Sequence, residues 1–159
     1  MKKSILAEKQ LQLVPWGDLR GDYGNDARQV GEDLRLLLFG DDADAAIRVE
    51  CSTSNQGHLF QCAPAAVSVI VAAVAEGSIP AGNLGSSLDV LGLILAGYAD
   101  ESEAALGNSD LREQCHAEAM KGYWSLLRVA CERDFFNAWK IAQDVLRVLD
   151  EAHSRQFKQ

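Results

Sequence analysis

The 159-residue sequence has no lysine or arginine from Val49 through Leu111, although seven acidic residues lie in that span. The whole chain has 23 acidic and 15 basic residues, which gives a formal charge of −8 and a pI near 4.8. A nucleic-acid-binding protein needs a basic surface for phosphate, so this balance argues against one. The apolar content of 48% excludes a disordered acidic tail and supports a folded core.

The sequence also lacks an unbroken apolar run long enough for a membrane helix. The least charged stretches, residues 63–75 and 84–99, are interrupted by proline, glycine, serine or aspartate. Both are shorter than the ~20 apolar residues that a span requires. The N-terminal apolar run ends at Glu8, well short of a secretory signal. These absences predict a cytoplasmic protein without a membrane partner.

Cysteine is scarce, and the four cysteines form no CxxC motif. In the cytoplasm we expect them all to be reduced. Cys115 and Cys131 fall on apolar helical positions, where a free cysteine acts as a small hydrophobic residue. The three histidines lack the spacing of metal ligands, and no glycine-rich phosphate motif is present. We therefore predict neither a metal nor a cofactor.

Hydrophobic periodicity predicts an all-α fold. Apolar residues at 26–39 recur at helical spacing, capped by Asn25 or Asp26, and a second helix is expected over residues 41–51. Residues 64–76 are rich in β-branched side chains, which also suit a buried strand. A proline in the first turn, a glycine after the last residue and the length of the segment favour a helix buried on most sides.

Further helices are predicted at residues 83–99 and 109–131, with Ser109 as the cap of the latter, and from a cap at Asp134 to about residue 153. The chain then forms a single domain of three antiparallel helical pairs after an N-terminal segment at 1–25. The pairs are residues 26–54, 64–99 and 109–153. Pairs of this size are typical of short HEAT-like solenoids, and a compact helical bundle is the alternative.

The tryptophans fall into two groups. Trp124 and Trp139 lie on apolar helical faces and are predicted to be in the core. Trp16 precedes the first clear helix, so we expect it to hold the N-terminal segment against that helix, with an exposed binding role as the alternative.

Charge is distributed unevenly, with −2 over residues 1–48, −7 over 49–111 and +1 over 112–159. An acidic surface speeds the encounter with a basic partner. Three clusters are therefore predicted to contact such a partner, although solvated loops and helix caps are the alternative for each residue. They comprise Asp18, Asp22, Tyr23 and Asp26 in the N-terminal segment, Asp41, Asp42 and Asp44 after the first helix, and Asp100, Glu101 and Glu103 in a predicted loop at 100–108.

Residues 52–58 form the most polar uncharged stretch, and a serine there could act with His58 in a small hydrolase. However, the GxSxG turn that presents a nucleophilic serine is missing. A helix-ending turn, whose side chains satisfy free backbone groups, is the favoured interpretation. We predict that the chain is not an enzyme, and a His58-dependent activity is the alternative.

Two parts of the chain resemble small bacterial HEAT-like repeat proteins. One is Val14-Pro15-Trp16-Gly17-Asp18-Leu19 followed by Asp22-Tyr23-Gly24-Asn25-Asp26-Ala27. The other is Asn55-Gln56-Gly57-His58 followed by Ala63-Pro64-Ala65-Ala66-Val67, which is similar to the turn between two helical pairs. The sequence differs from that turn in having Asn55 for histidine, His58 for threonine and Ser68 for a second proline.

Members of this group often resemble immunity proteins of antibacterial toxins, including toxins delivered between neighbouring bacteria by type VI secretion. The resemblance implies that the chain binds a cognate toxin and neutralises it. A nuclease is the expected toxin, because its cleft must be basic to hold a polyanion. A HEAT-like scaffold or regulatory adaptor that binds a basic protein is the alternative.

Overall fold

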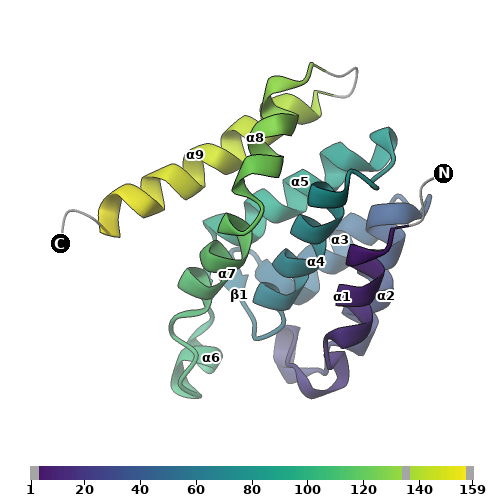
Figure 1. Cartoon of the computed structure of the whole chain (residues 1–159). Helices are drawn as coiled ribbons and strands as arrows, with labels where there is room; N and C mark the ends of the chain where they lie inside the picture. Colours follow the sequence, from purple (N-terminus) through teal and green to yellow (C-terminus); the bar gives the residue numbers. More distant parts are fainter. Residues whose placement is uncertain (1–3, 134–136, 157–159) are drawn as a thin grey trace.

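A computed structural model of the protein describes residues 4–133 and 137–156. The all-α prediction is confirmed: helices account for most of these residues, and they pack as a bundle (Figure 1). The helices are α1 (Leu6–Leu13), α2 (Arg28–Phe39), α3 (Ala45–Ser54), α4 (Ala63–Glu76), α5 (Ala81–Ala96), α6 (Glu101–Ala105), α7 (Leu111–Met120), α8 (Tyr123–Cys131) and α9 (Ala138–Gln156). Short 3₁₀ turns lie at Trp16–Asp18 and Asp22–Gly24, and two short strands are β1 (His58–Leu59) and β2 (Tyr98–Ala99).

The helical pair α4 and α5 forms the middle of the bundle. Helices α2 and α3 pack on one side of it, and α7, α8 and α9 pack on the other (Figure 1). Side chains on most faces of α4 are buried, including Val67 and Ile70, which confirms the helix predicted for residues 64–76. Pro64 lies in its first turn, and Gly77 ends it with a left-handed backbone at φ +67°. None of the helices described is long and apolar enough to cross a membrane.

Helix α1 lies in the N-terminal segment for which no helix was predicted. It packs on α4 through the buried residues Ala7 and Leu11. The carboxylate of Glu76, at the end of α4, accepts hydrogen bonds from the Ser4 hydroxyl at 2.7 Å and from the Ile5 backbone N–H at 2.6 Å. These contacts satisfy free groups at the start of α1. The hydrogen bond from Ser4, together with those from the backbone, lowers the pKa of Glu76 to about 2.

We expect Glu76→Gln to destabilise the protein at pH 7 by removing the charge that holds the start of α1. Because the folded-state pKa is lowered, the carboxylate stabilises the fold above its ordinary pKa of 4.5, and this contribution is lost as the pH falls toward 2. Urea midpoints of wild type and variant should therefore differ at pH 7 and converge near pH 2. A difference between the urea midpoints that stays constant across this pH range contradicts the assignment. Glu132→Gln, at an exposed position, serves as the control.

The helix predicted for residues 109–131 is wrong as a single element, because the chain breaks between α7 and α8. A Cβ atom on Gly122 would overlap the Val71 side chain of α4, so the close approach of these helices requires glycine. Because α8 begins as a new helix at Tyr123, Leu126 faces the core and Trp124 is 78% exposed. The prediction that Trp124 lies in the core is therefore wrong. Of the two cysteines at apolar helical positions, Cys115 is buried and Cys131 is exposed.

Helix boundaries differ from the prediction in several other places. Helix α3 begins at Ala45 rather than near residue 41, and Asp42 instead accepts a hydrogen bond from the Asp44 N–H. The segment predicted as a loop at residues 100–108 contains α6, and β2 replaces the predicted end of the preceding helix. Helix α7 follows Asp110 rather than a Ser109 cap. The Asp134 cap lies outside the described residues.

The other two tryptophans have different environments. Trp16 is buried, and its indole Nε1–H donates to the Leu11 carbonyl at 3.0 Å, which confirms its predicted role in holding the N-terminal segment. Trp139 is only partly buried, and Lys140 Nζ lies 5.3 Å from its ring centroid, within the range of a cation–π contact.

Candidate protein-binding site

A hollow of about 550 Å³ lies where two of the three predicted acidic clusters meet. It is lined by residues of the N-terminal segment at 20–24, of the α3–β1 turn at 55–60 and of the segment around α6 at 100–106. Asp22 and Tyr23 come from the first segment, and Asp100 and Glu103 come from the third. We call this feature the acidic hollow.

The two short strands bring these segments together. Strands β1 and β2 pair in parallel, with His58 opposite Tyr98. A Cβ atom on Gly97 would lie 2.7 Å from Leu59 Cδ2 and 3.0 Å from the Gly57 carbonyl oxygen, so only glycine permits this close pairing. The pairing of His58 with Tyr98, 40 residues later in the sequence, thus places the polar turn at residues 52–58 beside the segment that leads into α6.

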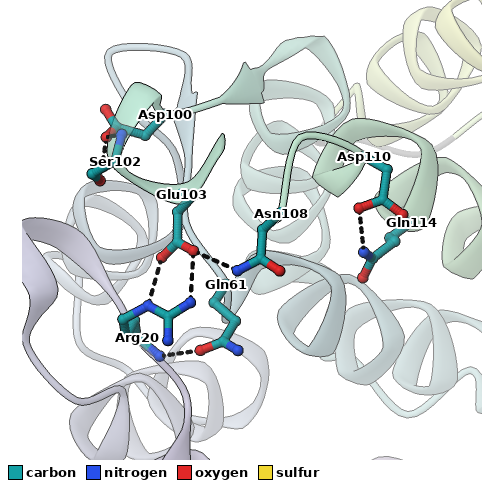
Figure 2. A network of polar contacts seen from close by, with 8 residues as sticks. All are labelled: Arg20, Gln61, Asp100, Ser102, Glu103, Asn108, Asp110 and Gln114. Atoms are coloured by element: carbon teal, nitrogen blue, oxygen red, sulfur yellow. Dashed lines mark hydrogen bonds and ion pairs between the residues drawn. The ribbon is translucent and has the colours of Figure 1, made fainter. Parts of the chain in front are cut away.

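An ion pair joins the two walls of the acidic hollow (Figure 2). Arg20 donates from Nη2 to Glu103 Oε2 at 2.9 Å and from Nε to Oε1 at 3.2 Å, which is a bidentate arrangement. Asn108 donates to the same carboxylate at 2.8 Å, and the Arg20 backbone N–H donates to Gln61 Oε1 at 3.0 Å. Because these partners occupy it, the Glu103 carboxylate is a structural group of the wall.

The predicted contact residue Glu103 is therefore not available to a partner. Glu103 is only 2% exposed, and burial by itself raises the pKa of its carboxyl. Hydrogen bonds from Arg20 and Asn108 outweigh that effect and hold the pKa below its ordinary value. The buried charge is thus compensated within the protein, and the acidic surface of the hollow comes from its neighbours Asp22 and Asp100.

The rim of the acidic hollow has an unusual backbone. Tyr23 and Gln56 have φ values of +55° and +52°, in the left-handed region that costs a non-glycine residue about 1–2 kcal/mol. Gly24 and Gly57 follow them with φ values of +74° and +85°. Asn55 Nδ2 donates to Asp22 Oδ2 at 2.9 Å and ties the two turns together. This backbone holds the Tyr23 side chain 86% exposed.

We expect Tyr23→Gly to leave the protein as stable as wild type or to stabilise it by up to about 1 kcal/mol. The side chain buries almost nothing, and glycine adopts the left-handed backbone without strain. Chemical denaturation measures the change. A clear loss of stability would show instead that the tyrosine ring supports the fold.

His58 lines the hollow, and the ring of Tyr98 lies against it. Their ring centroids are 5.1 Å apart at an interplanar angle of 62°, and Tyr98 is exposed. His58 Nδ1 lies 3.4 Å from Asp100 Oδ2, which is within ion-pair range but outside hydrogen-bond geometry. Asp100 caps α6, and hydrogen bonds from the Ser102 hydroxyl and N–H lower the pKa of its carboxyl. Asp100 therefore keeps its negative charge in mildly acidic solution.

The polar turn at residues 52–58 does not assemble a serine–histidine pair. Thr53 donates its hydroxyl to the Val49 carbonyl, Ser54 is buried, and Ser102 bonds Asp100. Over residues 4–133 and 137–156, no serine hydroxyl is hydrogen-bonded to His58.

The remaining predicted contact residues lie outside the hollow. Asp18 and Glu101 are exposed next to segments that line it, and Asp26 accepts a hydrogen bond from the Arg28 N–H at the start of α2. Asp41, Asp42 and Asp44 follow the other end of α2, about 18 Å away along a 12-residue helix. Asp42 pairs with Arg48 at 2.7 Å. The cluster of Asp41, Asp42 and Asp44 is therefore a separate surface.

Sequence reasoning assigned no binding role to Arg20, Asn55, Gln56 and Leu106, which line the hollow, or to Tyr98, which lies beside it against His58. Gly97 was a usable signal for Tyr98, because a glycine late in a helical stripe marks a helix end. Among the described residues, no group of three or more histidine, cysteine or acidic side chains is placed to hold a metal ion. No family model, curated protein or solved structure matches the chain.

Proposed function

We propose that the chain is an immunity protein that binds a cognate antibacterial toxin through the acidic hollow and blocks it by direct occlusion. The single observation that supports this proposal is the convergence of Asp22, Asp100 and the exposed Tyr23 on one hollow. A second exposed tyrosine, Tyr98, lies beside the hollow against His58. Arg20 also lines the hollow, but its guanidinium is occupied by Glu103. The surface offered to a partner is thus acidic and aromatic.

The chemistry of this surface suits a basic protein partner. Carboxylates steer the encounter with lysine and arginine side chains, and exposed tyrosines supply the rigid contact area that is enriched among binding hot spots. A nuclease toxin presents such basic side chains at the cleft that holds its nucleic acid. The resemblance of residues 14–27 and 55–67 to HEAT-like immunity proteins supports the same function, which would be exerted in the cytoplasm.

Co-expression with the product of the adjacent gene tests the proposal. We expect that product to be a toxin domain, to stop growth when expressed alone, and to co-purify with this chain at physiological salt. Association should slow as salt is raised, because screening weakens steering. Tyr23→Gly, whose fold is expected to be intact, should weaken the complex about tenfold or more. The proposal fails if the product is not a toxin domain or if no complex forms.

The size of the hollow favours an adaptor as a second candidate. A stable interface buries roughly 800 Å² on each partner, whereas the hollow alone has room for only a few side chains of a basic segment. An isolated basic peptide that binds with the affinity of the whole partner protein, from a gene with no toxin beside it, would favour the adaptor. A toxin domain that binds far more tightly than its own peptides would favour the immunity protein.

A further inference from the structure

A second surface lies along the groove between α8 and α9. The groove has a volume of about 600 Å³, and Leu127, Ala130, Cys131 and Leu146 form its apolar floor. Trp124 lies on the same face of α8, one turn before Leu127, and its exposed ring stacks edge-on against Tyr123 at a centroid distance of 5.8 Å. Tyr123 in turn donates to Asp150, a lining residue of the groove.

The charge of this surface differs from that of the acidic hollow. Two basic and two acidic side chains of α9 line the groove, namely Arg147, Asp150, Glu151 and Arg155. The C-terminal part at residues 112–159 carries +1, whereas residues 1–111 together carry −9. A strongly basic partner gains little attraction here, so this groove does not share the preference of the acidic hollow.

We propose that the α8–α9 groove is the site at which a second copy of this chain binds, with Trp124 as the central contact. A two-fold interface sets the same patch against itself, so any charged groups on the patch must include both signs if the two copies are not to repel each other. The groove meets that requirement, while the acidic surface of residues 1–111 repels a second copy. The exposed face of α9 also reaches beyond the neighbouring helices toward the C terminus, where another molecule can approach it (Figure 1).

The ion pair between Arg147 and Asp144 does not prevent Arg147 from contacting a second copy of the chain. Both are 67% exposed and their ion pair of 3.1 Å joins neighbouring turns of one helix, which makes it weak and easily exchanged. The expected dimer is held chiefly by apolar burial of Trp124 and Leu127. Its formation should consequently depend little on salt, in contrast to the binding of a basic protein at the acidic hollow.

Sedimentation of the full chain over a range of concentrations tests the proposal. We expect a monomer–dimer equilibrium that Trp124→Ala weakens by about 30-fold, the typical effect of losing a tryptophan hot spot. Tyr98→Ala, which removes an exposed aromatic ring far from α8 in the sequence and outside the lining of the α8–α9 groove, is the matched control and should leave the equilibrium unchanged. A wild-type chain that stays monomeric, or a dimer that Trp124→Ala does not weaken, overturns the proposal.

Thiol alkylation supplies a second readout that needs no variant. Cys131 lines the groove, and Cys51 is exposed on α3. Burial raises the pKa of the Cys62 thiol to about 12 and that of Cys115 still further, so both should react slowly. Raising the protein concentration should protect Cys131 relative to Cys51. A ratio of the Cys131 and Cys51 alkylation rates that stays the same at all protein concentrations contradicts the proposal. Neither outcome bears on binding at the acidic hollow, which is tested separately.

Discussion

Arg20→Leu is expected to lower the free energy of unfolding by about 3–5 kcal/mol at pH 7. The substitution leaves the carboxylate of Glu103 charged and only 2% exposed, with Asn108 as a remaining neutral donor. Glu103→Gln should cost about half as much, because the side chain of Arg20 is 35% exposed and recovers water when its partner is neutralised. Chemical denaturation of the two variants measures this asymmetry. Equal losses would show that the pair is no more than a surface contact.

The loss in free energy of unfolding caused by Arg20→Leu should also depend on pH. In the wild type the folded-state pKa of Glu103 is lowered, so its contribution to stability is present above the ordinary pKa of 4.5 and is lost as the pH falls. In the variant the unpaired, buried carboxyl has a raised pKa, so the folded state gains stability on protonation. The difference between the two proteins is thus largest near neutral pH and shrinks toward pH 3. A deficit that stays constant or grows in acid contradicts this assignment.

Trp16→Ala should cost about 3–5 kcal/mol, the range for deleting a buried aromatic side chain. The Trp16 ring packs so closely on α2 that a Cβ atom on Gly31 would lie 2.9 Å from it. The Trp16 carbonyl also accepts the Ala27 N–H, which closes the segment that holds Asp22 and Tyr23. Loss of the ring should therefore loosen one wall of the acidic hollow as well as the fold.

Two further variants separate the contributions of the tryptophan. Trp16→Phe keeps most of the apolar contact but leaves the Leu11 carbonyl without its donor, which should cost about 1–3 kcal/mol. Trp124→Ala removes an exposed ring and should change the free energy of unfolding of the monomer by less than about 0.5 kcal/mol. Denaturation curves for the three proteins at low concentration check this order. Comparable losses for Trp16→Ala and Trp124→Ala would show that Trp16 does not hold the N-terminal segment.

Local signals in the sequence were sufficient to predict most of the helices. Proline in the first turn and glycine after the last identified α4, and the periodic apolar residues identified α2, because both signals depend on neighbouring residues. The break at Gly122 was not predictable in this way. It follows from contact with Val71, which lies about 50 residues earlier in the chain. The error then propagated to Trp124, whose side chain faces solvent only because the helix restarts.

The acidic hollow was predictable in its composition but not in its shape. The absence of lysine and arginine from Val49 through Leu111 identified the acidic character of the surface. Which clusters meet is decided by the pairing of β1 with β2 and by the ion pair of Arg20 with Glu103, 83 residues apart. A single sequence carries no record of such distant contacts, so Glu103 and Asp100 looked equivalent although one is buried and the other lines an open surface.

The most direct measurement compares two charge-matched variants in their association with the proposed toxin partner. Asp22→Asn with Asp100→Asn removes two charges from the acidic hollow while keeping side-chain acceptors for Asn55 and for the α6 cap. Asp41→Asn with Asp44→Asn removes two charges at the other end of α2. We expect the first pair to slow association and reduce its salt dependence, and the second to behave as wild type. Equal effects of the two pairs, or a larger effect of the second, would contradict binding at the acidic hollow.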